Sequence, residues 1–151
     1  MTLPYPINME PSYEGSVHGG LARSQSFVAQ TDIYPGRPVK LSTTDPKKVV
    51  AWGTAGYENA PYFGIPRRSA ELYNSYGETV DYYRAGQLIT IDFENIMSVV
   101  SSVNVTTGQK VYINKASGAY TNVATDNGDP IGSFTDSAGG QSLVKIHINK
   151  L

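Results

Sequence analysis

The sequence predicts an all-β domain whose strands form a barrel or a sandwich. Short segments with apolar residues at every second position recur along the chain. In residues 110–114, for example, Val111 and Ile113 alternate with Lys, Tyr and Asn. The 15 glycines, 11 tyrosines and 17% charged residues in 151 positions are typical of a β protein with many turns. These features indicate roughly nine to eleven short, regularly spaced strands.

The second half of the chain repeats the glycine-punctuated strand pattern of the first half. Gly36 recurs as Gly108, a shift of 72 positions, and Gly64 recurs as Gly132, a shift of 68. One insertion or deletion of four residues therefore separates the two anchors, and we interpret the pattern as a degenerate β duplication. The matched segments are 34–41 with 106–113, 63–65 with 131–133, and 88–93 with 143–148.

The individual strands follow from local patterns and turn residues. Val39–Leu41 is expected to pair with Val49–Trp52, and a second hairpin is expected over Ala85-Gly86. Ser69 begins the one segment, 69–73, whose pattern suits a helical turn. The other expected strands are 26–30, 80–84, 87–93, 96–103, 110–114, 119–123, 131–134 and 143–148. We expect one core from Val111, Ile113, Ile131, Phe134, Val144, Ile146 and Ile148.

Residues 1–26 differ from the rest and are expected to form an extended N-terminal arm, followed by a β domain at 27–151. Pro4, Pro6 and Pro11 disfavour regular pairing, and the apolar residues are too sparse for a core. Such a segment is either disordered or lies on a partner, and its repeated tyrosines and aliphatic residues favour partner contact. The expected contact residues are Leu3, Tyr5, Ile7, Tyr13 and Leu21.

Composition excludes several classes of protein. The absence of cysteine excludes disulfides, thiol catalysis and thiolate metal sites. A net charge of −1 argues against nucleic-acid binding, which needs a basic surface. No apolar run approaches the roughly 20 residues of a membrane span. The N-terminus lacks the pattern of a signal peptide, so we expect synthesis and use without Sec export.

The candidates for chemistry are few. His18 and His147 would need to meet, with a carboxylate, to bind a metal, and His147 is expected to point outward from the last strand. Asp92 and Glu94 share a strand face and could act as a glycosidase pair, but a solvated face is the simpler interpretation. The segment 126–129 resembles part of a calcium loop yet is better explained as a tight turn. We predict no enzyme activity, no metal and no cofactor.

Tyrosines are concentrated in the middle of the chain. A tyrosine offers a large contact area with only two side-chain torsions, which suits interfaces. Contact with a second copy or another partner is the favoured interpretation, while a carbohydrate platform and ordinary half-buried packing remain alternatives. The residues predicted for such contact are Tyr57, Tyr62, Tyr73 and Tyr76.

The duplicated pattern and the arm together resemble the capsid cement, or head decoration, proteins of tailed bacteriophages. The residues that carry the resemblance are Pro35–Val39, Phe63–Ile65 and Ala85–Ile91, with their counterparts in the second half, over about 27–149. The resemblance implies a small β-barrel or tulip-like domain and no catalytic residues. The long segment between Arg67 and Thr79 and the proline-containing arm depart from the pattern, which leaves the symmetry and the outward surface open.

The resemblance also implies a function and partners. We expect a non-enzymatic virion protein on the outer capsid surface that binds the major capsid protein and cements neighbouring subunits, with no nucleic acid or membrane as partner. Three-fold symmetry comes from the resemblance, since the residues themselves do not distinguish a dimer from a homotrimer. The alternative is a carbohydrate- or receptor-binding module of a virion fibre or tail.

Overall fold

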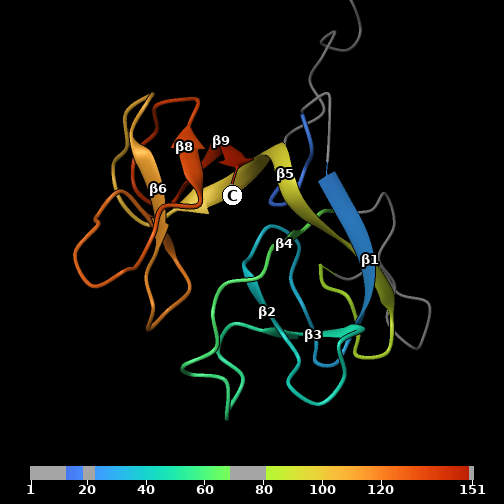
Figure 1. The fold of residues 1–151 in the computed structure, drawn as a ribbon. Helices are drawn as coiled ribbons and strands as arrows, with labels where there is room; N and C mark the ends of the chain where they lie inside the picture. The colour runs from blue at the N-terminus through green and yellow to red at the C-terminus, as the bar shows by residue number, and fades with distance from the viewer. Residues whose placement is uncertain (1–12, 19–22, 69–80, 150–151) are drawn as a thin grey trace, which may run out of the picture.

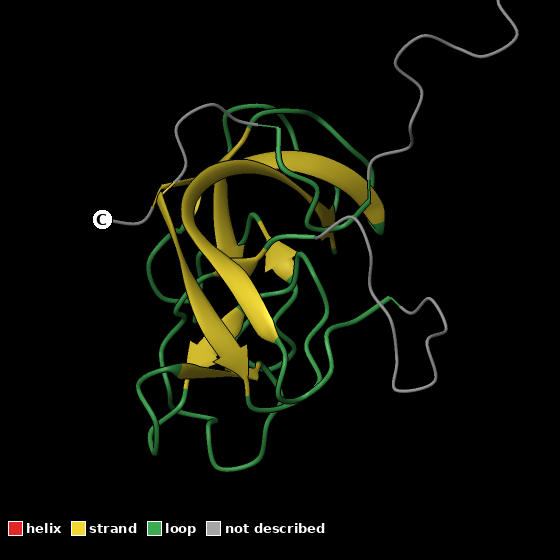
Figure 2. Cartoon of the chain, turned by 90° about the vertical axis from the view of Figure 1, so that its right-hand side faces the viewer, coloured by secondary structure: helices red, strands yellow, loops and turns green. Residues whose placement is uncertain are grey.

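The computed structural model describes residues 13–18, 23–68 and 81–149, and these form nine strands in one continuous sheet. In Figure 2 the described residues are drawn as strands and loops only, which confirms the all-β prediction. They include no helix long and apolar enough to cross a membrane. The expected helical turn at 69–73 lies outside the described residues.

The first half of the chain closes into a five-stranded ring, whose arrangement can be followed in Figure 1. β1 pairs with β3 in parallel and with β5 in antiparallel orientation, β2 pairs with β3, and β4 pairs with β5. A bridge between Val39 of β2 and Gly64, just before β4, completes the ring. The strands are β1 (Arg23–Ala29), β2 (Val39–Leu41), β3 (Lys48–Ala51), β4 (Ile65–Pro66) and the first part of β5 (Leu88–Ser101).

The second half forms a closed barrel with the same connections. The last part of β5 pairs with β7 in parallel and with β9 in antiparallel orientation, while β6 pairs with β7 and β8, and β8 pairs with β9. β5 therefore belongs to both barrels, and Figure 1 shows it running between them. The remaining strands are β6 (Lys110–Ile113), β7 (Tyr120–Thr121), β8 (Gly132–Phe134) and β9 (Ser142–Asn149).

The strand register confirms the predicted duplication. In the first barrel Val39 bridges Gly64, and in the second Val111 pairs with Gly132, the residues that the sequence alignment matches. Two isolated bridges, Ile33 with Tyr83 and Val105 with Ala138, are also equivalent in the two barrels, although these residues lie just outside the segments matched in the sequence. β1 corresponds to the second part of β5 at the same shift of 72, because Val28 faces Leu88 while Val100 faces Leu143. The chain is thus two copies of one barrel that share a strand.

Gly64 and Gly132 occupy equivalent places where a neighbouring strand comes very close. A Cβ added to Gly132 would lie 1.9 Å from the carbonyl oxygen of His147, in the backbone of β9. A Cβ added to Gly64 would lie 2.4 Å from Cγ2 of Ile91, in β5. Both glycines are needed for close packing, whereas Gly36 and Gly108 are turn residues with φ of 81° and 92°.

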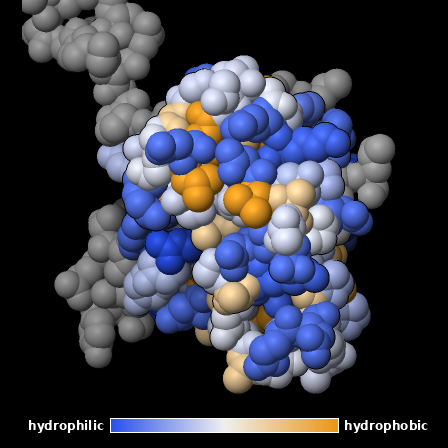
Figure 3. Space-filling view, turned by 90° about the vertical axis from the view of Figure 1, so that its left-hand side faces the viewer, coloured by the Kyte–Doolittle hydropathy of each residue, from blue (hydrophilic) through white to orange (hydrophobic). Residues whose placement is uncertain are grey.

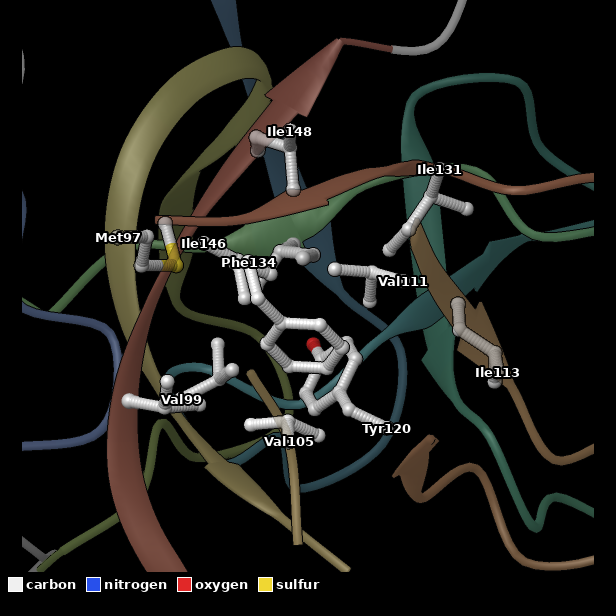
Figure 4. Close-up of a cluster of buried hydrophobic side chains, with 12 residues drawn as sticks. Met97, Val99, Val105, Val111, Ile113, Tyr120, Ile131, Phe134, Ile146 and Ile148 are labelled. Atoms are coloured by element: carbon white, nitrogen blue, oxygen red, sulfur yellow. The ribbon is translucent and has the colours of Figure 1, made fainter. Parts of the chain in front are cut away.

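Each barrel has its own hydrophobic core. Figure 4 shows the second core, where Phe134 and Tyr120 meet between the strands and Val111, Val105 and Ile146 surround them. All seven residues predicted for this core are buried. The first core contains the buried residues Phe27, Ala29, Ile33, Val39, Val49, Tyr83, Ile89 and Ile91.

Two strand predictions are wrong. The segments 87–93 and 96–103 were expected as separate strands, but β5 runs without a break from Leu88 to Ser101. Residues 80–84 were expected to form a hairpin with 87–93, but Tyr83 exchanges backbone hydrogen bonds with Ile33 instead. The loop before β5 therefore closes the end of the first barrel.

Part of the segment predicted as an arm is packed on the second barrel. Val17 bridges Met97 of β5, the N–H of His18 donates to the oxygen of Ile96, and the N–H of Ser98 donates to Ser16. β1 begins at Arg23, so the folded domain also takes in residues that we had placed in the arm.

Candidate interaction surfaces

Of the two carboxylates considered for catalysis, Asp92 does not lie on a solvated face, and Glu94 is half-buried. Asp92 is fully buried and accepts two hydrogen bonds from Arg67, at 2.9 Å from Nε and 2.5 Å from Nη2. Both carboxylate oxygens are thus engaged by the arginine, and the side chain has no contact with solvent. This pair positions β4 against β5, and the interpretation of Asp92 as part of a solvated face is therefore wrong.

The described residues contain no group of three or more His, Asp or Glu side chains that could hold a metal ion. His147 is half-buried beside the buried Ile146 and Ile148, which agrees with an outward orientation. His18 instead shares a 2.6 Å hydrogen bond between its Nε2 and the hydroxyl of Ser98. Burial lowers the pKa of His18, with Lys145 adding to the effect and Asp136 opposing it.

Tyr57 and Tyr62 were predicted as contact residues, and the structure uses both inside the chain. Tyr57 is only 9% exposed, and its hydroxyl accepts hydrogen bonds from the N–H and hydroxyl of Thr43. These bonds and one with Ser42 lower the pKa of Tyr57 to about 8. Tyr62 packs on the second core, and burial raises its pKa. Little of the Tyr57 ring is therefore exposed, whereas Tyr62 is half-buried.

A cleft of about 380 Å³ lies between the two barrels and is lined by Lys40, Trp52, Tyr62, Ile113 and Lys115, among others. The Lys40 ammonium lies 4.3 Å from the centre of the Trp52 ring and donates a hydrogen bond to the backbone carbonyl oxygen of Tyr57 at 2.7 Å. The Trp52 Nε1–H donates to the oxygen of Lys115 across the cleft.

The ring of Trp52 is therefore part of the junction between the barrels. Gly118 lies so close to it that an added Cβ would be 2.8 Å from the ring. The hydroxyl of Tyr120, in the second barrel, also donates to the oxygen of Gly36 in the first, at 2.7 Å. The one tryptophan is held between Lys40 and Gly118, which gives no support to a carbohydrate platform at this cleft.

A cluster of tyrosines and arginines lies on the surface where the N-terminal segment crosses the barrels. We call it the tyrosine–arginine surface. Tyr13 and Tyr34 are 53% and 39% exposed. The guanidinium of Arg68 lies 5.3 Å from the centre of the Tyr13 ring, and that of Arg37 lies 4.4 Å from the Tyr34 ring. Tyr82 packs on Tyr34, with 5.6 Å between ring centres.

Backbone contacts hold this surface in place. Gly15 has a φ of 82° and lies against Pro35, Gly36 and Arg68, with no room for a Cβ. The N–H of Arg68 donates to the Gly15 oxygen, and its Nε donates to the Glu14 oxygen. Tyrosine and arginine on a fixed backbone are the residue types that dominate binding energy at protein interfaces. The described residues thus present a surface suited to binding another protein.

Only part of this surface was predicted. Tyr13 was among the expected arm contacts, while Leu3, Tyr5, Ile7 and Leu21, and also Tyr73 and Tyr76, lie outside the described residues. Tyr34, Arg37, Arg68 and Tyr82 were missed because they come from three distant parts of the chain. The Tyr34-Pro35-Gly36-Arg37 turn was the available signal, since an aromatic and a cation flank a tight turn there.

Exposed aliphatic side chains occur at equivalent positions in the two barrels. Leu88 and Leu143, the first residues of the matched closing segments, are 68% and 41% exposed. On the end of the second barrel, Figure 3 shows a small group of hydrophobic side chains surrounded by hydrophilic ones. In the second barrel, Val123 is 48% exposed and lines a shallow hollow together with Val103.

These features define a class of protein: an all-β module of two barrels that share a strand, with an exposed tyrosine–arginine surface and no metal-binding cluster among its described residues. The chain belongs to a family of phage structural proteins, because the family model described as "Structural cement protein (E217 gp24/Pam3 gp6)" matches residues 2–149. The resemblance inferred from the sequence is confirmed by this match.

Two solved structures are similar to this chain. A chain of "The capsid of Myoviridae Phage XM1" aligns with 99% of this chain and 99% of its own length, at 16% identity and a TM-score of 0.64, which shows a shared fold. "The crystal structure of head fiber gp8.5 N base in bacteriophage phi29" aligns with 85% of this chain and 95% of its own, at 16% identity and a TM-score of 0.48. A search of curated proteins finds no match.

Proposed function

We propose that this protein binds the outer surface of the phage capsid, where it cements neighbouring major capsid subunits and stabilises the head against the pressure of the packaged DNA. The observation that carries the proposal is the family match over residues 2–149, nearly the whole chain. The expected partners are the major capsid protein and further copies of this chain, most simply as a homotrimer, with no role for nucleic acid or a cofactor.

The tyrosine–arginine surface supports a protein partner. Arg37 is exposed and weakly paired, because its Nε lies 3.7 Å from the Glu14 carboxylate. Arg68 is better fixed, through bonds to Glu14 and to the Asp81 carboxylate at 2.8 Å. Arginines that are held in place lose little side-chain freedom on binding, so more of their contact energy appears as affinity. We assign the capsid contact to this surface and to the N-terminal residues before it.

The structure indicates where a truncation that tests the N-terminal arm should end. Removing residues 1–26 would delete the pairing of 15–18 with β5 and half of β1, so it would damage the fold as well as the arm. Removal of residues 1–12 avoids both. We expect this shortened protein to keep the β domain and its thermal stability but to co-sediment much less with undecorated capsid shells.

Point variants separate the surface from the arm. Tyr34→Ala and Arg37→Ala should each weaken binding to shells, by roughly thirtyfold for a residue at the centre of an interface. Lys110→Ala is the matched control, because it removes an exposed cation from β6 in the other barrel. Wild-type binding by the truncated protein and by both surface variants would show that the capsid contact lies elsewhere.

A further inference from the structure

The internal duplication exposes a difference between the two barrels at one strand edge. In the second barrel, the edge of β5 at Ile96–Ser98 is covered by residues 15–18, and Ser98 is 2% exposed. The equivalent edge of the first barrel is Ser24–Ser26 of β1, at the shift of 72. Ser24, Gln25 and Ser26 are all exposed. Among the described residues, no strand pairs with this edge.

The backbone groups of Ser24 and Ser26 point away from β5. Strand parity shows this, because the N–H of Val28 donates to the oxygen of Lys47 on the β3 side, and alternate residues of a strand bond to the same side. β3 is paired only with Val28 and Ala29, so it ends before reaching Ser26. Exposed, unpaired edges of this kind are the usual template for an added strand.

The sequence contains a segment built to be an edge strand. Within residues 3–9, Leu3, Tyr5, Ile7 and Met9 occupy the odd positions, while the two prolines occupy even ones. In a strand, the N–H groups of alternate residues point to the same side. Every odd residue therefore offers an N–H on one side, and both prolines, which have none, fall on the other, as in strands that pair on a single side.

We propose that residues 3–9 of a second copy of this chain add to β1 along Ser24–Ser26 as an edge strand. The chain already uses residues 15–18 to cover the equivalent edge of its second barrel. Among the described residues the edge at Ser24–Ser26 has no such cover, and the sequence of residues 3–9 suits an added strand. When each copy donates its segment to the next, every such edge is covered, and head-to-tail contacts of this kind form a closed ring where the rotation between copies closes. This goes beyond capsid binding, because it names what joins the copies to one another.

The pairing also fixes where the side chains go. Phe27 and Ala29 of β1 face the core, so Ser24, Ser26 and Val28 face outward. Residues opposite one another in a hydrogen-bonded antiparallel pair have side chains on the same face. The odd, apolar residues of the added strand would therefore lie on the outer face that carries Val28 and the exposed Leu88. A continuous apolar strip would result, available for contact with the capsid.

Because the chain contains no cysteine, every disulfide between copies in a linking test comes from the introduced cysteines. Full-length protein with Ser26→Cys is mixed with full-length protein carrying one cysteine at Tyr5, Ile7, Pro6 or Asn8, and oxidised without capsids. We expect disulfide-linked pairs of two copies at an odd position, several-fold more than at the even ones. Ser117→Cys, in an exposed turn of the second barrel, is the control acceptor and should link to none.

Several results would overturn the assignment. Equal linking at odd and even positions would exclude a paired strand, and no linking would leave the edge unoccupied. A chain carrying both cysteines that links only within itself would show that the segment returns to its own β1. Linking of Ser26→Cys only to a capsid subunit, in decorated shells, would make the occupant a capsid strand.

Proline substitution tests the backbone bonds separately from the side chains. Ile7→Pro removes an N–H on the bonding side and should abolish both the link and the oligomer seen by light scattering. Asn8→Pro, on the other side, should preserve them, and Ile7→Ala controls for loss of the side chain. Equal behaviour of the two proline variants would refute the pairing. Because the assay contains no capsid, its failure leaves the capsid-binding proposal standing.

Discussion

Gly132→Ala should destabilise the protein strongly, because the added methyl group meets backbone rather than a side chain. Its Cβ would lie 1.9 Å from the His147 oxygen, 2.8 Å from the His147 carbonyl carbon and 3.0 Å from Cα of Ile148. β8 and β9 would have to separate by about 1 Å, which a close-packed interior resists. Overpacking of a core costs about 1–3 kcal/mol, and a rigid backbone neighbour places this variant at or above the upper value.

The assay is thermal unfolding followed by circular dichroism, compared with two other glycine variants. A loss of about 3 kcal/mol corresponds to a fall of roughly 6–12 °C in Tm for a chain of this size. Gly64→Ala should cost less, because its nearest neighbour is the Ile91 side chain. Gly53→Ala has nothing within 4 Å of the added Cβ and should leave Tm nearly unchanged. A Tm of Gly132→Ala within 2 °C of wild type would refute the close approach of β8 and β9.

The remaining predictions concern the core, the ion pair and one tyrosine. Ile146→Asp should abolish the cooperative unfolding transition, because it places a carboxylate in the second core, while Lys145→Asp should lower Tm only slightly; equal Tm values would mean that the register of β9 is wrong by one residue. Arg67→Ala should cost about 3–5 kcal/mol in chemical denaturation because it leaves Asp92 buried and unpaired, and Asp92→Asn should cost less because the Arg67 side chain is 33% exposed. Absorbance at 295 nm should show one tyrosine titrating near pH 8, absent in Tyr57→Phe; since this pKa lies below that of an unfolded tyrosine, the free energy of unfolding should rise between about pH 8 and pH 10.

The repeated part of the fold was predictable because its signals are local. A strand that buries one face needs apolar residues at every second position, so the alternation alone predicts Val111, Ile113 and Ile146 as core residues. Gly64 and Gly132 are fixed by close approach to a neighbouring strand, and a side chain there would prevent pairing. Constraints of this kind survive duplication, which is why the anchors matched at shifts of 72 and 68 occupy equivalent places in the final register.

The parts that were missed depend on contacts between distant segments. Asp92 alternates with Ile91 and Phe93 as a surface residue would, and only the arrival of Arg67 from another strand makes its burial possible. The tyrosine–arginine surface is likewise assembled from residues far apart in sequence, such as Tyr13 and Arg68. Periodicity reports which face of a strand is apolar, but not which polar residue will find a partner.

The continuity of β5 has a mechanical consequence. Its first part completes one barrel and its second part completes the other, so neither barrel retains all five strands without it. Tyr120 and Trp52 add hydrogen bonds across the junction. The two barrels should therefore unfold as one cooperative unit, with a calorimetric enthalpy equal to the van't Hoff enthalpy. For the proposed role of linking neighbouring capsid subunits this continuity matters, because a load applied at the tyrosine–arginine surface would be carried through a continuous strand and not through a flexible linker.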